Sequence, residues 1–176
     1  ALAAKSGNVV SPEEIDAFYT RGDKPVGVLR VLRALDAHLI VSPTDLYCLA
    51  YEYLEDVHGH GVRYAEFFWN PTGTVRVSGI RYDAAQDAIV AAMRDAQRDF
   101  GVIGRLIPSI DREAAPAEAV QMVEWMKAHR APEVIGIGID YRENERPPEL
   151  LIEAYRAARA AGFKCTAHAG EFGMPW

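Results

Sequence analysis

Residues 102–139 read VIGRLIPSIDREAAPAEAVQMVEWMKAHRAPEVIGIGI, and this segment indicates the class of fold. It begins and ends with two apolar runs, residues 102–107 and 134–139, each of which predicts a buried strand. Three apolar residues between these runs recur at helical spacing and predict a helix over about residues 116–129; they are Val120, Val123 and Met126. A strand, a helix and a second strand in this order are typical of two parallel strands joined by a helical crossover.

The same alternation extends in both directions along the chain. Aromatic residues predict a strand over about 62–69, and a last strand is expected over 163–168. Capping residues, prolines and glycines predict further helices, one starting near residue 12 and others over about 26–38, 43–57, 83–100 and 147–161. Residues 72–82 are expected to be irregular.

Four strands separated by helices, with no two joined by a tight hairpin turn, predict an α/β fold with a parallel sheet. No internal repeat or convincing linker interrupts residues 1–176, so a single domain is expected. The pattern alone leaves two architectures open, a doubly wound sheet and a (β/α)8 barrel. In both, the functional site lies where the strands lead into the following loops.

Polar residues follow each of the four expected strands. Because the carboxyl ends of parallel strands lie at one edge of a sheet, these residues are expected to converge there. They are Asn70, Ser109, Asp111, Asp140, Glu143, His168 and Glu171. Asn70 and the preceding Trp69 either line the floor of a pocket or simply pack and end their strand.

The pair His168 and Glu171 carries the strongest chemical signal. A histidine at the end of a strand can act as a neutral metal ligand, and a glutamate three residues later can transfer protons. Such a pair suits metal-assisted hydrolysis. The alternative is a buried histidine tied to a backbone carbonyl, with a solvated glutamate nearby.

The composition excludes several classes of protein. The chain of 176 residues has a net charge of -6 spread along its length, so it offers no basic face to nucleic acid. Small uncharged or cationic substrates fit this charge better. Cys48 and Cys165 show no disulfide or metal spacing, and no apolar run is long enough to cross a bilayer. A cytoplasmic location with no membrane partner is therefore expected; the oligomeric state is left open.

Four groups of residues resemble the adenosine and adenine deaminase family, in that family's order and approximate spacing. They are Tyr64 to Pro71, Asp99 to Val102, Gly138 to Asp140 with Glu145, and His168 to Glu171. The resemblance covers nearly the whole chain. It implies a (β/α)8 barrel that binds one Zn²⁺ ion and hydrolyses the 6-amino group of a purine, giving hypoxanthine or inosine and ammonia.

The resemblance also assigns roles to two residues. His168 corresponds to the zinc-binding histidine on the fifth barrel strand, and Glu171 to the glutamate that exchanges protons with the purine ring. Zinc lowers the pKa of bound water toward neutrality, so that a hydroxide can attack the carbon bearing the amine. That carbon is electrophilic enough only when the adjacent ring nitrogen is protonated. Glu171 would therefore have to hold a proton in a dry pocket rich in carboxylates.

The sequence departs from the family pattern at both ends. No strand carrying the family's His-x-His pair precedes residue 1, and the later metal ligands and strands are missing after the fifth strand. The pair His58 and His60 lies at a predicted helix end, before a strand, and is not expected to bind zinc. Since catalytic zinc sites take three or more protein ligands, His168 alone cannot hold the metal. We therefore expect an incomplete barrel from a longer chain, inactive by itself.

Substrate preference depends on Glu143 and Asp140. Members that prefer adenosine have a glycine at the position of Glu143, and a carboxylate there could accept a hydrogen bond from a ring N–H that only the free base carries. This favours adenine or a similar 6-aminopurine. Alternatively, Glu143 is a solvated charge paired with Arg142 or Arg146. Asp140 is either a pocket residue or a stabiliser of its loop.

Two other functions remain open from the sequence. The first is a non-catalytic descendant of a deaminase that has lost its metal and keeps the strands for purine binding or contact with a partner. The second is another amidohydrolase that acts on a cyclic amide. A His-x-His pair upstream, with further histidine and aspartate ligands downstream, would support the deaminase.

Overall fold

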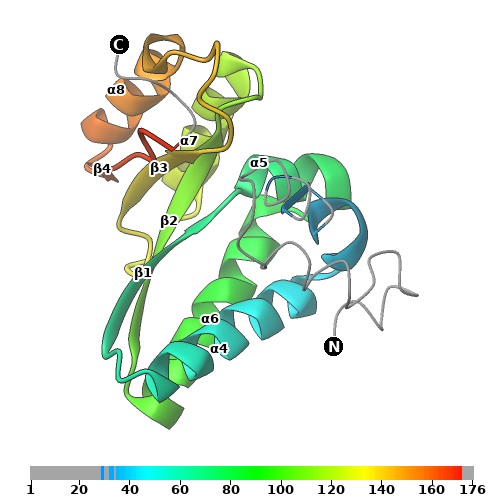
Figure 1. The fold of residues 1–176 in the computed structure, drawn as a ribbon, viewed down its shortest axis with the longest axis vertical. Helices are drawn as coiled ribbons and strands as arrows, with labels where there is room; N and C mark the ends of the chain where they lie inside the picture. The colour runs from blue at the N-terminus through cyan, green and yellow to red at the C-terminus, as the bar shows by residue number, and fades with distance from the viewer. Residues whose placement is uncertain (1–28, 30–31, 34, 172–176) are drawn as a thin grey trace.

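The computed structural model describes residues 29, 32–33 and 35–171, and it contains a four-stranded parallel sheet (Figure 1). The strands are β1 (Tyr64–Trp69), β2 (Ile103–Asp111), β3 (Gly136–Asp140) and β4 (Lys164–Cys165). Each pairs with the next along the chain, in the order β1-β2-β3-β4. A doubly wound sheet reverses its strand order at a switch point, whereas a barrel keeps chain order. The observed order is that of a (β/α)8 barrel segment.

The strand β2 holds the sheet together because its two halves pair with different neighbours. Residues 103–108 of β2 pair with β1, and residues 109–111 pair with residues 138–140 of β3. The strand is therefore longer than the expected 102–107. Its last residues, Ser109 to Asp111, lie within the sheet and not in the following loop.

The fourth strand follows β3 beyond its two regular residues. The backbone N–H groups of Lys164, Thr166 and His168 donate to the carbonyl oxygens of Ile135, Ile137 and Ile139, at 3.1, 2.9 and 3.0 Å respectively. This alternation of hydrogen bonds is that of a parallel strand pair. The expected strand over 163–168 therefore lies along β3 up to His168, at the same edge as the end of β3.

The helices between the strands agree with the sequence to within a few residues. They are α4 (Pro43–Gly59), α6 (Tyr82–Phe100), α7 (Pro116–Ala128) and α8 (Ile152–Ala160), the last preceded by the 3-10 turn η3 (Pro148–Leu151). At the start of α4, the Asp45 carboxylate accepts the backbone N–H of Ser42 at 2.9 Å, which is half of a capping box. At the end of α6, Gly101 has a φ of 72°, a conformation that favours glycine.

The described residues include part of one of the two expected N-terminal helices. The helix expected near residue 12 lies outside the described residues. Of the helix expected over 26–38, residues 29, 32 and 33 are helical, and the π-helix η1 (Leu35–Leu39) follows.

One expectation about local structure was wrong in part. Of residues 72–82, only 79–81 are irregular: a helical turn, α5 (Pro71–Gly73), leads into the π-helix η2 (Thr74–Ser78), and α6 begins at Tyr82. The Asn70 side chain accepts the Gly73 N–H at 2.7 Å, and Pro71 occupies the first position of the turn. A cap and a proline of this kind start a helix even where the following residues have no helical period.

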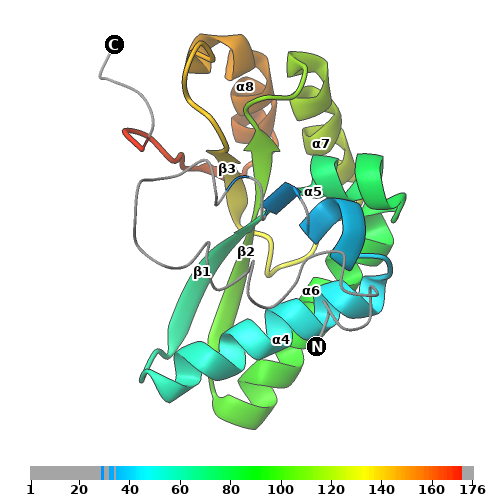
Figure 2. The same cartoon turned by 45° about the vertical axis from the view of Figure 1, so that its right-hand side comes forward.

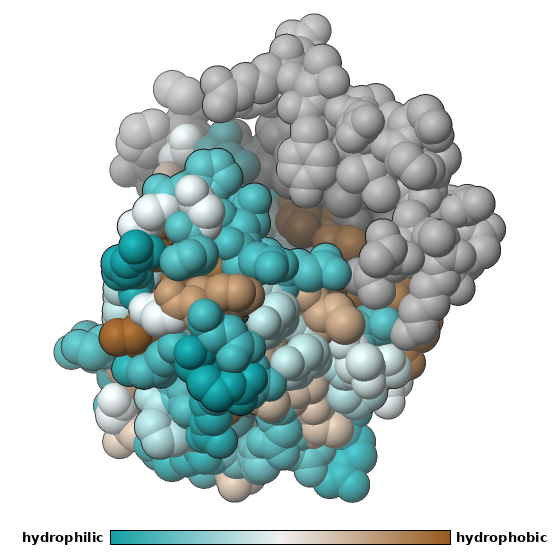
Figure 3. All heavy atoms as spheres, turned by 90° about the horizontal axis from the view of Figure 1, so that it is seen from below, coloured by the Kyte–Doolittle hydropathy of each residue, from teal (hydrophilic) through white to brown (hydrophobic). Residues whose placement is uncertain are grey.

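The core lies between the sheet and the helices. Figures 1 and 2 show α4 and α6 side by side along the lower part of β1 and β2, with α7 and α8 beside the upper part of the sheet. Fully buried side chains come from every layer, among them Leu54, Met93, Leu106, Met122 and Ile137. Seen from below, hydrophilic residues cover most of the coloured surface and hydrophobic ones are scattered (Figure 3). Within the described chain, no helix is both long enough and apolar enough to span a membrane.

Candidate functional site

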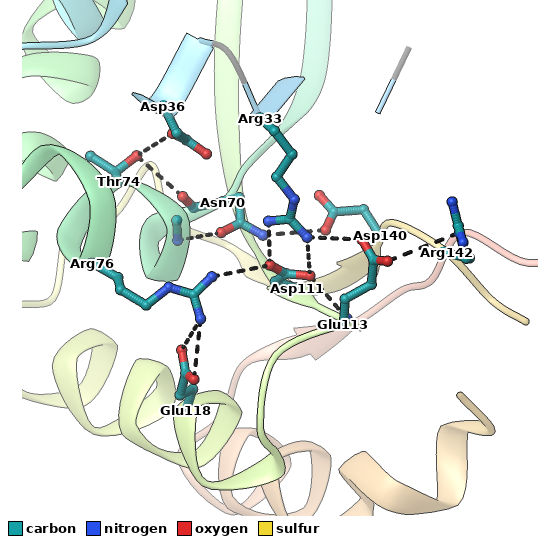
Figure 4. Close-up of polar contacts among 11 residues, drawn as sticks. Arg33, Asp36, Asn70, Thr74, Arg76, Asp111, Glu113, Glu118, Asp140 and Arg142 are labelled. Carbon is teal, nitrogen blue, oxygen red and sulfur yellow. Dashed lines mark hydrogen bonds and ion pairs between the residues drawn. The ribbon is translucent and has the colours of Figure 1, made fainter. Parts of the chain in front are cut away.

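The carboxyl ends of β2 and β3 bring two aspartates together. Asp111 and Asp140 are the last residues of their strands and are paired in the sheet register. The Asn70 amide, at the end of β1, donates to the Asp140 carboxylate at 3.4 Å. Figure 4 shows these side chains gathered at the ends of neighbouring strands, as expected from their positions in the sequence.

An arginine from the N-terminal segment reaches this edge of the sheet. Arg33 donates to both oxygens of Asp111, at 2.5 and 3.1 Å, and to Glu113 at 2.9 Å (Figure 4). Its guanidinium also lies 3.9 Å from the centroid of the Tyr141 ring. A planar guanidinium that binds a carboxylate with two hydrogen bonds gives a strong and directional ion pair. Arg76 lies 4.0 Å from the same aspartate, so two positive charges flank it.

Two carboxyl groups in this region titrate near neutral pH. Burial raises the pKa of Asp140 to about 7, although the neighbouring Ser109 and Asn70 side chains act in the opposite direction. Burial also raises the pKa of Asp36 to about 6, against a hydrogen bond from Thr74. Both groups can therefore carry or release a proton in the physiological range.

The Ser109 hydroxyl is a buried polar group without a partner. Its side chain is fully buried, and no group of the described residues forms a hydrogen bond with its oxygen. Ser109 acts on the pKa of Asp140, so its hydroxyl lies beside that carboxyl. A buried hydroxyl next to a carboxyl near its pKa is suited to contact a ligand.

His168 is held in an orientation suitable for a metal ligand. Its ring Nδ1 is 3.3 Å from the carbonyl oxygen of Ile139, so Nδ1 carries the proton and the lone pair of Nε2 is available. The ring packs edge-on against Phe68, with the centroids 4.8 Å apart. The alternative of a buried histidine tied to a backbone carbonyl was correct about the carbonyl. It was wrong about burial, because His168 is exposed.

Glu143 is buried and holds the loop that follows β4. Its Oε1 accepts the N–H of Gly170 at 2.9 Å, and its Oε2 accepts the N–H of Glu171 at 2.7 Å. The residue is 4% exposed, and its carboxylate pairs with Arg112 at 3.4 Å. The alternative of a solvated charge paired with Arg142 or Arg146 was therefore wrong. Arg142 instead lies 4.0 Å from Glu113.

The structure holds the backbone of Glu171 but leaves its side chain exposed. Within the described part of the chain, the Glu171 carboxylate makes no hydrogen bond or ion pair. It is thus available to a substrate. The dry pocket expected around it is not formed by the described residues.

No metal centre is complete among residues 29, 32–33 and 35–171. No group of three or more histidine, cysteine, aspartate or glutamate side chains is placed there to hold a metal. The donor set fits one zinc ligand, His168, whose Nε2 is available. His58 and His60 lie where α4 ends, before β1 begins, which is the opposite end of the strand from Asn70. His60 there binds the carbonyl of Asp56, and His58 stacks on Phe100.

Three arginines of the site, Arg33, Arg76 and Arg112, were not identified from the sequence. Arg112 directly follows a strand end, so its position gave a signal that could have been used. Arg33 lies in the N-terminal segment, and no feature of its neighbours in sequence indicates that it reaches Asp111. Only the three-dimensional arrangement reveals this contact.

Comparisons with known proteins agree with the geometry. A family model described as adenosine deaminase matches residues 8–176. An adenine deaminase of Schizosaccharomyces pombe is 35% identical over 186 residues, covering 98% of this chain and 50% of the relative. One from Marinomonas sp. is 34% identical over 137 residues, covering 78% of this chain and 40% of the relative.

Solved structures give the same result. An amidohydrolase from Burkholderia ambifaria, solved with bound Zn, is 71% identical with a TM-score of 0.94 and covers 99% of this chain and 48% of its own. An adenine deaminase from Arthrobacter aurescens is 28% identical with a TM-score of 0.86, covering 98% and 52% respectively. The chain thus spans about half the length of the proteins it matches.

Proposed function

The chain belongs to the adenosine deaminase family, and on this premise we propose that the protein hydrolyses the 6-amino group of a purine with the help of one zinc ion. Water replaces the amine, so that adenine gives hypoxanthine and ammonia. The observation that carries the proposal is the geometry of His168, with Nδ1 fixed on a backbone carbonyl and Nε2 available. The relatives' names and the zinc of the Burkholderia structure support it.

His168 is the proposed zinc ligand among the described residues. The chemistry that zinc supplies when bound is a lowering of the pKa of water to about 7. The hydrogen bond from Nδ1 to Ile139 fixes the tautomer and the ring orientation, as is usual for metal-binding histidines. Because one ligand is too few, residues 1–176 alone are proposed to be inactive.

Glu171 is the proposed acid. Protonation of the ring nitrogen next to the amine-bearing carbon makes that carbon electrophilic, and the exposed carboxyl of Glu171 has no competing partner among the described residues. Its backbone is held by Glu143, so the carboxyl starts from a fixed point. Attack by water forms the C–O bond, and one proton of the water passes to the amine, so that the C–N bond breaks and ammonia departs. The second proton of the water returns to Glu171 as the C=O bond forms, and the ring nitrogen keeps the proton that it received.

Asp140 and Glu143 are the proposed substrate-binding residues. Asp140 combines partial burial, a pKa of about 7 and a neighbouring hydroxyl on Ser109, which suits a polar edge of the purine. The Glu143 carboxylate lies against the backbone of Gly170 and Glu171, beside the proposed acid. A ring N–H that only the free base carries could donate to a carboxylate at this position, which favours adenine over adenosine.

The intact protein tests the proposal through metal content and product formation. We expect about one zinc per chain, and ammonia release from adenine faster than from adenosine. Protein that binds adenine without turnover would favour a non-catalytic descendant, and hydrolysis of dihydropyrimidines in place of purines would favour another amidohydrolase.

Both thiols are free in the structure, which is consistent with the cytoplasmic location that we also propose.

A further inference from the structure

We propose that Arg112 is a positioning residue which, with Glu143, forms a buried clamp that fixes the loop from His168 to Glu171 for zinc binding and proton transfer. This inference rests on the proposed function of that loop. In this proposal Arg112 holds the loop without contacting the purine. Glu143 holds the loop in addition to its proposed role in substrate binding.

The clamp joins three successive strand ends. Arg112 follows β2, Glu143 follows β3, and the loop follows β4. The Arg112 backbone N–H donates to the carbonyl of Asp140 at 3.2 Å, and its Nη2 donates to the carbonyl of His168 at 2.9 Å. A second nitrogen, Nη1, lies 3.4 Å from Oε1 of Glu143. One guanidinium thus bridges β2 to the two loops beyond it.

Glu143 binds the same loop from the other side. Its two oxygens accept consecutive N–H groups, those of Gly170 and Glu171. These two N–H groups can point to one carboxylate because the loop turns sharply at Gly170, which has a φ of 76°. The loop is therefore fixed at a carbonyl by Arg112 and at two N–H groups by Glu143.

Burial makes this arrangement rigid. The Arg112 and Glu143 side chains are only 4% and 6% exposed, whereas the Arg33 and Arg76 side chains are 36% and 50% exposed. Buried charges are stable only when they are paired and hydrogen-bonded. Neither side chain can therefore move away from its partners without a large loss of folding free energy. The clamp therefore has one favoured geometry.

The clamp acts on both proposed functional groups through the backbone. Arg112 holds the carbonyl of His168 while the His168 ring rests on Ile139, and Glu143 holds the N–H of Glu171. Displacements of about 1 Å in supporting residues are enough to lower catalytic rates about 100-fold. Loosening the loop should therefore weaken both zinc binding and proton transfer.

Two variants of the intact protein test the clamp: Arg112→Met removes the guanidinium, and Arg112→Lys keeps a positive charge. For Arg112→Met we expect the zinc Kd, measured by competition with a chromophoric chelator, to rise roughly 10–100-fold, which is the usual effect of losing a residue that supports a metal ligand. At saturating zinc, kcat should fall on the order of 100-fold with KM nearly unchanged. Arg112→Lys should restore part of both losses.

A matched control is Arg94→Met on α6. Arg94 forms an ion pair with Glu133 at 2.7 Å and makes no contact with the loop among the described residues. We expect its zinc affinity and kcat to equal those of the wild type. A folded Arg112→Met protein with wild-type zinc affinity and kcat would overturn the proposal.

Glu143→Gln decides the case if Arg112→Met does not fold. The amide keeps the shape of the carboxylate but can accept only one of the two N–H groups, so weaker zinc binding and a lower kcat are expected. Wild-type values of both in this variant would also overturn the clamp. Wild-type protein without zinc and without ammonia release would instead refute the proposed function. An active wild type with unchanged variants would refute the clamp alone.

Discussion

Arg33 and Asp111 are 78 residues apart in the chain, yet the guanidinium of one binds both carboxylate oxygens of the other. The contact ties the N-terminal segment to the end of β2. Asp111 is 2% exposed, so the arginine compensates a charge that water cannot reach. A residue from outside the sheet therefore holds the last side chain of β2 in the candidate site.

Arg33→Met should destabilise the fold by leaving Asp111 buried and less well compensated. Breaking a fully buried pair costs about 3–5 kcal/mol; because the Arg33 side chain is 36% exposed, we expect about 1–3 kcal/mol. Urea denaturation measures the change. The control is Arg156→Met, which removes an exposed ion pair with Glu153 on α8 and should have little effect. Equal changes in the two variants would contradict the structural role of Arg33.

The raised pKa of Asp140 predicts a specific dependence of stability on pH. An aspartate has a pKa of about 3.9 in the unfolded chain and about 7 here, so the folded state binds more protons between these values. Stability should therefore fall as pH rises from about 4 to about 7, by an amount on the order of 1–4 kcal/mol.

Asp140→Asn removes the titrating carboxyl and should flatten the decline of stability with rising pH, leaving the variant more stable than the wild type at pH 8. Denaturation at a series of pH values measures the stability of both proteins. As a control, Asp83→Asn should not flatten the decline, because the hydrogen bond from Arg81 lowers the pKa of Asp83. A wild-type slope in Asp140→Asn would show that Asp140 is not the group responsible.

Glu171→Gln should keep zinc and lose several orders of magnitude in kcat. The amide preserves the shape of the side chain but cannot donate a proton to the purine ring. Zinc content and ammonia release by the intact protein are the measurements. Glu153→Gln, an exposed change on α8, should leave both unchanged. Near-normal activity of Glu171→Gln would remove this residue from the mechanism.

Gly138→Ala should disturb the packing behind His168. A Cβ at this position of β3 would lie 2.7 Å from Cζ of Phe68, and the Phe68 ring packs edge-on against His168. Overpacking of this kind costs about 1–3 kcal/mol, and displacement of Phe68 should also weaken zinc binding. Thermal unfolding and chelator competition measure the two effects.

The matched control for Gly138→Ala is Gly59→Ala at the end of α4, where an added Cβ meets no atom within 4 Å. We expect no loss of stability there. A Gly138→Ala protein as stable as the control, with unchanged zinc affinity, would show that β3 can accommodate the methyl group.

Much of the fold was predictable because it depends on local patterns. Apolar runs, helical spacing and glycine stops located the strands β1 to β4 and the helices between them to within a few residues. The helical segment over residues 71–78 was missed because its residues lack apolar side chains at helical spacing. The Asn70 cap starts the helix there in spite of this. The choice between two architectures needed the strand order, which no local pattern contains.

The candidate site was predictable in part for the same reason. Positions at strand ends identified Asn70, Asp140, His168 and Glu171, because parallel strands bring their carboxyl ends to one edge. Burial of Glu143 could not be inferred, since a glutamate between two arginines in a polar loop is usually solvated. Its partner, Arg112, comes from a different strand end.

The amino-acid pattern is enough to infer the alternation of strands and helices, the family, and which side chains follow each strand. These features depend on residues within a few positions of one another, whose spacing is fixed by backbone geometry. The folded chain is needed to show that Arg33 pairs with Asp111 and that Arg112 and Glu143 bind the loop after β4. Such pairs form between residues distant in sequence, once burial has removed water as the competing partner.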